Sequence, residues 1–287
     1  MGTAAAAPLL PWGKTALLAP IENPENSKSL VDMSLVVSET AAPGIAHIAI
    51  NRPDKRNAVG PEARNDLIEA VTGALADSAV RSIVIGSTDG HFCAGGDIDS
   101  MIDLDVASGR TRMKDNHRMA RLLAEAEKPL IAAVEGFAVG AGAGIALLCD
   151  SIVLAEGGAL GFPFFRIGLT PDYGILHTLP RRVGNANARQ ILLRAQMIKG
   201  QDAVDMRLAD ELVADGGAEA RAVEIAQEMA DMPPHAFALT KRHLAMEPQT
   251  LEAALELEAL SQSLAFVGPE LEEGRAAFAE KRKPKFR

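Results

Sequence analysis

Residues 138–150, AVGAGAGIALLCD, form a run of glycines and alanines that turns aliphatic toward its end. No side chain between Ala138 and Leu148 gives or takes a proton at neutral pH. Such a run suits four structures: a membrane-spanning helix, a phosphate-binding loop, a packed core segment, or a catalytic loop that acts through its backbone. The sequence around it distinguishes among them.

The first two structures fit the sequence poorly. The apolar stretch 129–149 is nearly long enough to cross a bilayer. However, it contains Glu135 and consists largely of Ala and Gly, which drive insertion weakly. The glycines also lack the G-x-G-x-x-G pattern of dinucleotide sites and the Lys-Ser/Thr of a P-loop. We therefore expect neither a membrane segment nor a nucleotide loop here.

The composition is that of a globular, acidic protein. The chain has 287 residues, a net charge of −9 and 48% hydrophobic residues. An acidic chain is a poor candidate for general binding of nucleic acid. Cys93 and Cys149 give no disulfide framework, and neither they nor the six scattered histidines show metal-ligand spacing. We expect a cytoplasmic protein without a metal site and without a nucleic-acid partner.

Strands and helices alternate through the first two thirds of the chain. A Pro-Gly turn joins two β-rich runs into a hairpin over 34–53, and apolar residues at helical spacing predict a helix over 60–78. Short aliphatic runs predict buried strands at 80–87, 130–136 and 151–156. This alternation predicts an α/β fold with a parallel or mixed sheet.

Helical patterns predominate after Asn185, and we expect helices over 185–196, 201–213, 218–232 and 251–266. The chain therefore divides into a core over 34–200 and a helical subdomain over 201–287. Residues 1–33 are rich in Pro, Asn and Ser and lack the features of a signal peptide, so we expect a flexible arm.

Two turns share one design, in which a small-residue loop joins a buried strand to a helix. They lie at residues 94–97 and 140–142. Backbone N–H groups at a helix start are free and carry partial positive charge. Two such turns that converge would form an oxyanion hole. The alternative is that their glycines only permit close packing of helix on sheet.

Several segments resemble the enoyl-CoA hydratase/isomerase family, the crotonase superfamily. They are INRPDKRNAV (50–59), HFCAGGDIDSM (91–101), KPLIAAVEGFAVGAGAGIALLCD (128–150), FRIGLTPDYGILHTLPRRVG (165–184) and AFAEKRKPKF (277–286). The resemblance covers residues 34–287. It implies a spiral ββα core, a C-terminal helical oligomerisation region and a homotrimer or dimer of trimers. It also implies acyl-CoA thioester substrates, with CoA as part of the substrate and no further cofactor.

The resemblance also assigns residues to the substrate. It places the oxyanion-hole N–H groups at Gly96 and Ala141, and we expect Asp97 to cap the following helix. It places the path of CoA along Lys55, Arg56, Ala58, Ala94 and Ile98. The two cations suit the phosphates of CoA, although they also fit a solvated turn.

The catalytic carboxylates of the family's hydratases are missing. Their two glutamates correspond to Gly144 and Phe164, which can neither activate water nor protonate a carbon. Asp172, in LTPDYG, lies where several isomerases of the family carry a single acidic base. A single carboxylate suffices to move a proton from C2 to C4 and so shift a double bond. Asp172 could instead cap the following helix.

We therefore expect a Δ3-Δ2-enoyl-CoA isomerase with Asp172 as its base and Phe164 beside the substrate. A hydrolytic dehalogenase of the same family suggests a second mechanism that uses Asp172 together with His117, although His117 also fits a packing role. An atypical hydratase and a catalytically weak CoA-thioester-binding paralogue remain as further alternatives.

Overall fold

A six-stranded sheet carries the core of the protein, in a computed structural model that describes residues 34–246 and 250–286. The strand order is β1-β2-β3-β4-β6-β9, and only the β1–β2 pair is antiparallel. The strands are β1 (Val36–Ala42), β2 (Ile45–Ile50), β3 (Ser82–Ser87), β4 (Leu130–Val134), β6 (Ser151–Ala155) and β9 (Glu211–Val213). The predicted hairpin, the three buried strands and the α/β class are confirmed. The predicted arm over 1–33 lies outside the described residues.

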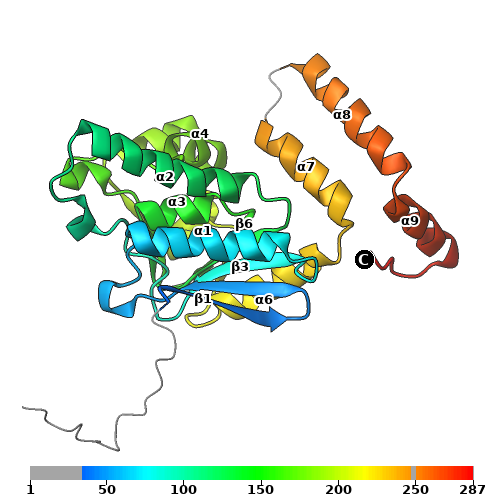
Figure 1. Ribbon diagram of the computed structural model, residues 1–287, viewed down its shortest axis with the longest axis horizontal. Helices are drawn as coiled ribbons and strands as arrows, with labels where there is room; N and C mark the ends of the chain where they lie inside the picture. The colour runs from blue at the N-terminus through cyan, green and yellow to red at the C-terminus, as the bar shows by residue number, and fades with distance from the viewer. Residues whose placement is uncertain (1–33, 247–249, 287) are drawn as a thin grey trace, which may run out of the picture. The chain divides into compact units, whose positions relative to one another are not determined.

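The central strands are apolar on both faces because helices cover both faces. Neighbouring residues of β3 and β4 belong to different hydrophobic clusters: Val84 and Ile131 lie in one, Ile85 and Ala132 in the other. Helix α6 (Ala218–Ala230) packs on the first face, against β3, β4 and β6. Helix α1 (Pro61–Ala76) packs on β1, β2 and the helix α2 (Val106–Ala124), on the other side of the sheet (Figure 1).

A smaller three-stranded sheet, which the sequence did not predict, lies beside the glycine-rich turns. It has the order β5-β7-β8 and comprises β5 (Phe137–Val139), β7 (Ala159–Gly161) and β8 (Met197–Lys199). An isolated bridge joins Cys93 to Ala138 of β5. The small sheet therefore ties the first glycine-rich turn to the segment that leads into the second.

The remaining helices are α3 (Ala141–Leu147), α4 (Ile175–Leu193), α5 (Gly200–Asp205), α7 (Pro234–Met246), α8 (Leu251–Phe266) and α9 (Pro269–Glu280). Helix α4 contains a kink at Gly184, where the backbone is not helical. In the part of the chain that the structure describes, no helix has the length and hydropathy needed to cross a bilayer. Leu251 and Leu260 of α8 are 76% and 62% exposed.

The prediction of one helix over 201–213 is wrong. Helix α5 ends at Asp205, and Glu211–Val213 form the edge strand β9, which pairs with β6. Pairing with an exposed strand edge outweighed the helical periodicity of this segment. The boundary that we expected at residue 200 thus precedes both β9 and α6, two elements that pack on the large sheet.

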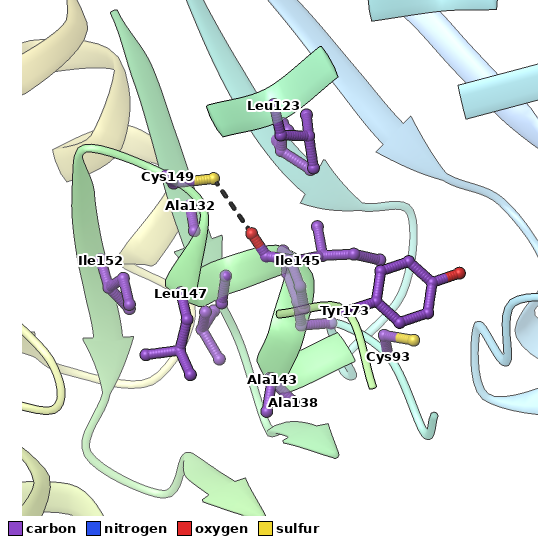
Figure 2. Packing of buried hydrophobic residues seen from close by; sticks show 14 of the residues in the cluster. Cys93, Leu123, Ala132, Ala138, Ala143, Ile145, Leu147, Cys149, Ile152 and Tyr173 are labelled. Atoms are coloured by element: carbon purple, nitrogen blue, oxygen red, sulfur yellow. Dashed lines mark hydrogen bonds between the residues drawn. The ribbon is translucent and has the colours of Figure 1, made fainter. Parts of the chain in front are cut away.

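Helix α3 is buried along its whole length because it is built from small residues. A Cβ on Gly142 would lie 2.6 Å from the Cβ of Cys93, and a Cβ on Gly144 would lie 2.5 Å from the Cβ of Tyr173. Cys93, Ile145 and Tyr173 belong to the same buried cluster (Figure 2). Side chains at positions 142 and 144 would therefore push α3 away from the neighbours that it packs against.

This packing predicts opposite effects for two Gly→Ala changes in helices. Gly144→Ala should lower the free energy of unfolding by about 1–3 kcal/mol, because it overpacks the contact with Tyr173. Gly73→Ala in α1 should raise it by about 0.5–1 kcal/mol, because nothing lies within 4 Å of the added Cβ and Ala favours the helix. Urea unfolding of both variants measures the difference. Equal effects would mean that α3 tolerates a side chain at position 144.

Candidate active site

The turn around Gly96 is held between two other segments by backbone hydrogen bonds. On one side, the Val59 N–H donates to the Gly95 carbonyl at 2.8 Å and the Asp97 N–H donates to the Val59 carbonyl at 3.1 Å. On the other side, the Val139 N–H donates to the Cys93 carbonyl at 2.9 Å. The turn is therefore fixed next to β5, which leads into α3.

Two glycines let the two turns touch. Gly95 has φ +114° and Gly140 has φ +53°, backbone conformations that residues other than glycine rarely adopt. A Cβ on Gly140 would lie 3.9 Å from the Cα of Gly95 and 3.8 Å from Cζ of Phe164. The two predicted turns thus meet, and the buried ring of Phe164 lies beside them.

Each turn leaves a backbone N–H without an acceptor. Val59 forms hydrogen bonds with Gly95 and Asp97, the residues on either side of Gly96. The N–H of Gly96 therefore points away from Val59. Ala141 is the first residue of α3, where an N–H has no acceptor within the helix. Within residues 34–246 and 250–286, neither group donates a hydrogen bond. Two adjacent free donors can bind an oxygen atom that carries negative charge.

Asp172 places a carboxylate in the turn before α4. Its Oδ2 accepts a hydrogen bond from Nδ2 of Asn116 at 3.3 Å, whereas its Oδ1 is buried and has no partner among the described residues. Burial raises the pKa of Asp172 to about 6, against the weaker lowering effects of its own backbone N–H, Arg112, the Asn116 bond and His117. Asp172 is therefore a carboxyl group that can exchange a proton near neutral pH.

The alternative hypothesis, that the Asp172 side chain caps the following helix, is wrong. Helix α4 follows Gly174, which adopts a left-handed conformation, and no side chain caps its first turn. The Asp172 backbone carbonyl accepts from the Ile175 N–H at 3.1 Å, but its carboxylate faces Asn116 on α2.

The orientation of the Asn116 amide is fixed by its other neighbours. Its Oδ1 accepts from Nη1 of the buried Arg64 at 3.0 Å and from the Tyr173 hydroxyl at 3.3 Å. A guanidinium can only donate, so the oxygen of Asn116 must face Arg64 and its NH₂ must face Asp172. Arg64 is itself paired with Asp115 at 3.3 Å. Asn116 therefore links a buried cation to the carboxylate.

Sequence reasoning missed Arg64, Asn116 and Tyr173. They come from α1, α2 and the turn before α4, and no spacing along the chain connects them. Tyr173 has φ +49°, and this backbone directs its ring into the core against α3. The one available signal was the absence of a side chain at Gly144, which leaves room for a large neighbour.

Among the described residues, His117 forms no hydrogen bond or ion pair with Asp172, although it is one of the groups that lower the pKa of Asp172. It is exposed on α2 and lines a groove with His177 of α4 and Lys241 of α7. Its neighbour Asn116 occupies the position against the carboxylate. A role for His117 in binding substrate stays a prediction.

The residues predicted for the path of CoA lie on two adjacent turns. The Ala94 N–H donates to the Arg56 carbonyl at 3.0 Å, which joins the turns. Ile98 and Arg56 are exposed, and Ala58 is buried with its carbonyl bonded to Arg52. The structure therefore brings this set together near the Gly96 turn.

Ion pairs join the cations of the first turn to the aspartates that follow Gly96. Arg52 pairs with Asp97 at 2.7 Å, and Lys55 pairs with Asp99, which raises the pKa of Lys55. Asp97 also accepts from the Asp99 N–H at 3.1 Å and so caps the 3₁₀ turn Ile98–Met101, as predicted. Any phosphate that binds Lys55 must therefore compete with Asp99.

Comparison with known proteins agrees with this geometry. The sequence profile described as enoyl-CoA hydratase/isomerase matches residues 40–287. Crotonyl-CoA hydratase from Syntrophomonas wolfei is 34% identical over 244 residues, which cover 84% of this chain and 94% of the relative. The 1,2-epoxyphenylacetyl-CoA isomerase of Escherichia coli is 30% identical over 248 residues, which cover 85% of this chain and 95% of the relative.

A solved structure shows the same fold. The crystal structure of an enoyl-CoA hydratase from Polaromonas sp. JS666 superimposes with a TM-score of 0.83 at 30% identity, covering 88% of this chain and 99% of that one. The fold and the superfamily expected from the sequence are thus confirmed. The chain belongs to the enoyl-CoA hydratase/isomerase family, whose members act on acyl-CoA thioesters.

Proposed function

We propose that this protein is an enoyl-CoA isomerase that converts a 3-enoyl-CoA into the conjugated 2-enoyl-CoA, with Asp172 as its single base. The observation that carries this proposal is the carboxylate of Asp172. One of its oxygens is buried and free, the other is held by Asn116, and its pKa of about 6 suits proton exchange near neutral pH.

The reaction needs only the parts described above. The thioester oxygen accepts hydrogen bonds from the N–H groups of Gly96 and Ala141. Oδ1 of Asp172 removes a proton from C2, and the electron pair moves onto the thioester oxygen to give a dienolate. The same proton then passes from Asp172 to C4, and the double bond settles between C2 and C3. Each backbone donor of an oxyanion hole is worth about 3–4 kcal/mol in the transition state.

The same parts do not favour hydration. Addition of water needs one group to activate water and one to protonate the carbon beside the carbonyl. The positions that the resemblance assigns to these groups hold Gly144 and Phe164, and the Cβ of Tyr173 fills the space beside Gly144. With both glutamates replaced, Asp172 is the one carboxylate to which we assign proton transfer, which supports isomerisation over hydration.

The dehalogenase-like alternative has less support. It requires a nucleophilic aspartate and a histidine that both reach the substrate. Here His117 is exposed in a groove with α4 and α7, and Asn116 contacts the aspartate instead. A CoA-binding paralogue without activity would leave the raised pKa of Asp172 without a use.

Two further features belong to the same proposal. Lys55 and Arg56 would bind phosphates of CoA at the turns beside Gly96, with Asp99 as the competitor for Lys55. Exposed leucines along α8, among them Leu251 and Leu260, suit contact with another copy of the chain in a trimer or a dimer of trimers.

The base is tested by Asp172→Asn, with Asp103→Asn as the matched control on an exposed loop. Asp103 adopts φ +57°, which Asn also tolerates. Loss of the base should slow conversion of a 3-enoyl-CoA by about 10²–10⁴-fold, and the control should keep the wild-type rate. The appearance of the conjugated thioester, followed by its ultraviolet absorbance, measures both. Full activity in Asp172→Asn would remove Asp172 from the mechanism.

Stability provides the control for folding in that experiment. The folded-state pKa of Asp172 lies above its ordinary value of 3.8, so ionisation disfavours the folded state as pH rises through about 6. Asp172→Asn removes this ionisation. The variant should therefore unfold at pH 8 at a temperature no lower than the wild type, so that a lost activity cannot be ascribed to unfolding.

The pH profile tests Asn116 as a positioning residue. The base acts in its ionised form, so the rate should fall as pH drops through about 6. The Asn116 hydrogen bond favours the ionised carboxylate, so Asn116→Ala should move this acid limb to higher pH. Thr111→Ala, an exposed change on the same helix, should leave it in place. An unmoved limb in Asn116→Ala would reduce Asn116 to a packing role.

A further inference from the structure

Three potential metal ligands meet on the face of the large sheet that α6 covers. Glu39 of β1 lies directly opposite His47 of β2 in the strand register. Glu219 belongs to the first turn of α6. One atom of each lies within 4.8 Å of the others. Helix α3 and Tyr173, the residue after Asp172, belong to the other hydrophobic cluster, so this cluster of Glu39, His47 and Glu219 is separate from the candidate active site.

The distances between these atoms match a tetrahedral metal. Nδ1 of His47 lies 3.4 Å from Oε1 of Glu39 and 3.5 Å from Oε1 of Glu219. Zinc binds nitrogen and carboxylate oxygen at about 2.0–2.2 Å. The ligands of a tetrahedron with such bonds are about 3.3–3.6 Å apart. The two distances from Nδ1 of His47 to the carboxylate oxygens therefore match those between two ligands of one zinc ion.

The histidine is buried and its ring is held in place. Its side chain is only 5% exposed, and a Cβ on Gly86 would lie 2.7 Å from its Nε2. Glycine at position 86 thus makes room for the ring. The buried Nε2 has no hydrogen-bond partner among the described residues, and Nδ1 is directed at the two carboxylates. The close packing against Gly86 thus holds Nδ1 where both carboxylates can bind the same cation.

The charges of the cluster also call for a cation. In the described ranges, neither Glu39 nor Glu219 forms an ion pair with a lysine or an arginine; each is paired only with His47. Two carboxylates that share one imidazole carry net negative charge, since a single ring can compensate at most one of them. Both are more than half exposed, at 64% and 52%, so a metal ion and a water molecule can reach them from solvent.

We propose that Glu39, His47 and Glu219 bind a zinc ion, with water as the fourth ligand. One nitrogen and two oxygens in tetrahedral arrangement suit zinc better than magnesium or calcium, which prefer six or more oxygen ligands. The bound ion links the β1–β2 hairpin to α6. The three residues are far apart in the sequence, so the spacing argument that led us to expect no metal site could not detect them.

The test uses the full chain after treatment with a chelator. Zinc is titrated against a chromogenic chelator, and cobalt(II) serves as a spectroscopic probe because tetrahedral cobalt absorbs strongly in the visible range. We expect one zinc per chain, a rise in melting temperature on binding, and the tetrahedral cobalt spectrum. Glu39→Gln and Glu219→Gln, both exposed, should each weaken binding at least about 10-fold and reduce the rise measured at the same zinc concentration.

Glu228→Gln is the matched control, since Glu228 lies on the same helix and pairs with Arg221. It should bind zinc as the wild type does. Absence of zinc uptake would overturn the proposal and leave His47 as a buried ring paired with two carboxylates. Zinc binding that persists unchanged in both Gln variants would overturn it equally, because the ion would then be bound elsewhere.

Discussion

The close approach of α3 to its neighbours is the constraint on which the candidate site depends. Gly142 and Gly144 bring the helix so near to Cys93 and Tyr173 that added Cβ atoms would overlap them. This approach places the start of α3 against the Gly96 turn. It also fixes the position of Tyr173 and of the preceding residue, Asp172, both of which bond to the side chain of Asn116. One set of packing contacts thus positions both the two free N–H groups and the carboxylate that we propose as the base.

Two opposed effects set the pKa of Asp172, the proposed base. Burial disfavours the ionised form of Asp172 and raises its pKa, whereas the Asn116 amide stabilises that form. Arg64 contributes through Asn116, whose oxygen it holds, and not by direct contact with the carboxylate. A direct ion pair with arginine would lower the pKa and make a weaker base. The intervening amide allows the carboxylate to be oriented and to keep a pKa near 6.

Local patterns in the sequence were sufficient for the buried strands and the two glycine-rich turns, whereas Asp172 was singled out by the resemblance to the family. The aliphatic runs of β3, β4 and β6 are long enough to identify strands covered on both faces, and Asp172 lies in a recognisable turn. The segment Glu211–Val213 was mistaken for helix because its pairing partner, β6, is about 60 residues away. Its three residues carry too short a pattern to outweigh the helical periodicity around them.

The support of the site was harder to predict, because it is built from tertiary contacts. Asn116 and His117 are adjacent on α2, and only the packing of that helix decides which one faces Asp172. A buried arginine such as Arg64 gives no sign in the sequence of its partner 52 residues away. The predicted chemistry therefore rested on residues in recognisable motifs, and the hydrogen bonds around the proposed base became visible only in the fold.

The central claim is that one carboxylate serves the site and that no second acid activates water. The most direct measurement supplies the wild-type protein with a 3-enoyl-CoA and, separately, with a 2-enoyl-CoA, and determines the products by mass spectrometry. The account predicts a conjugated product of unchanged mass from the first substrate. It predicts little or no gain of a water molecule by the second. Rapid formation of 3-hydroxyacyl-CoA from the 2-enoyl-CoA would contradict it, since a second acid would then have to line the pocket.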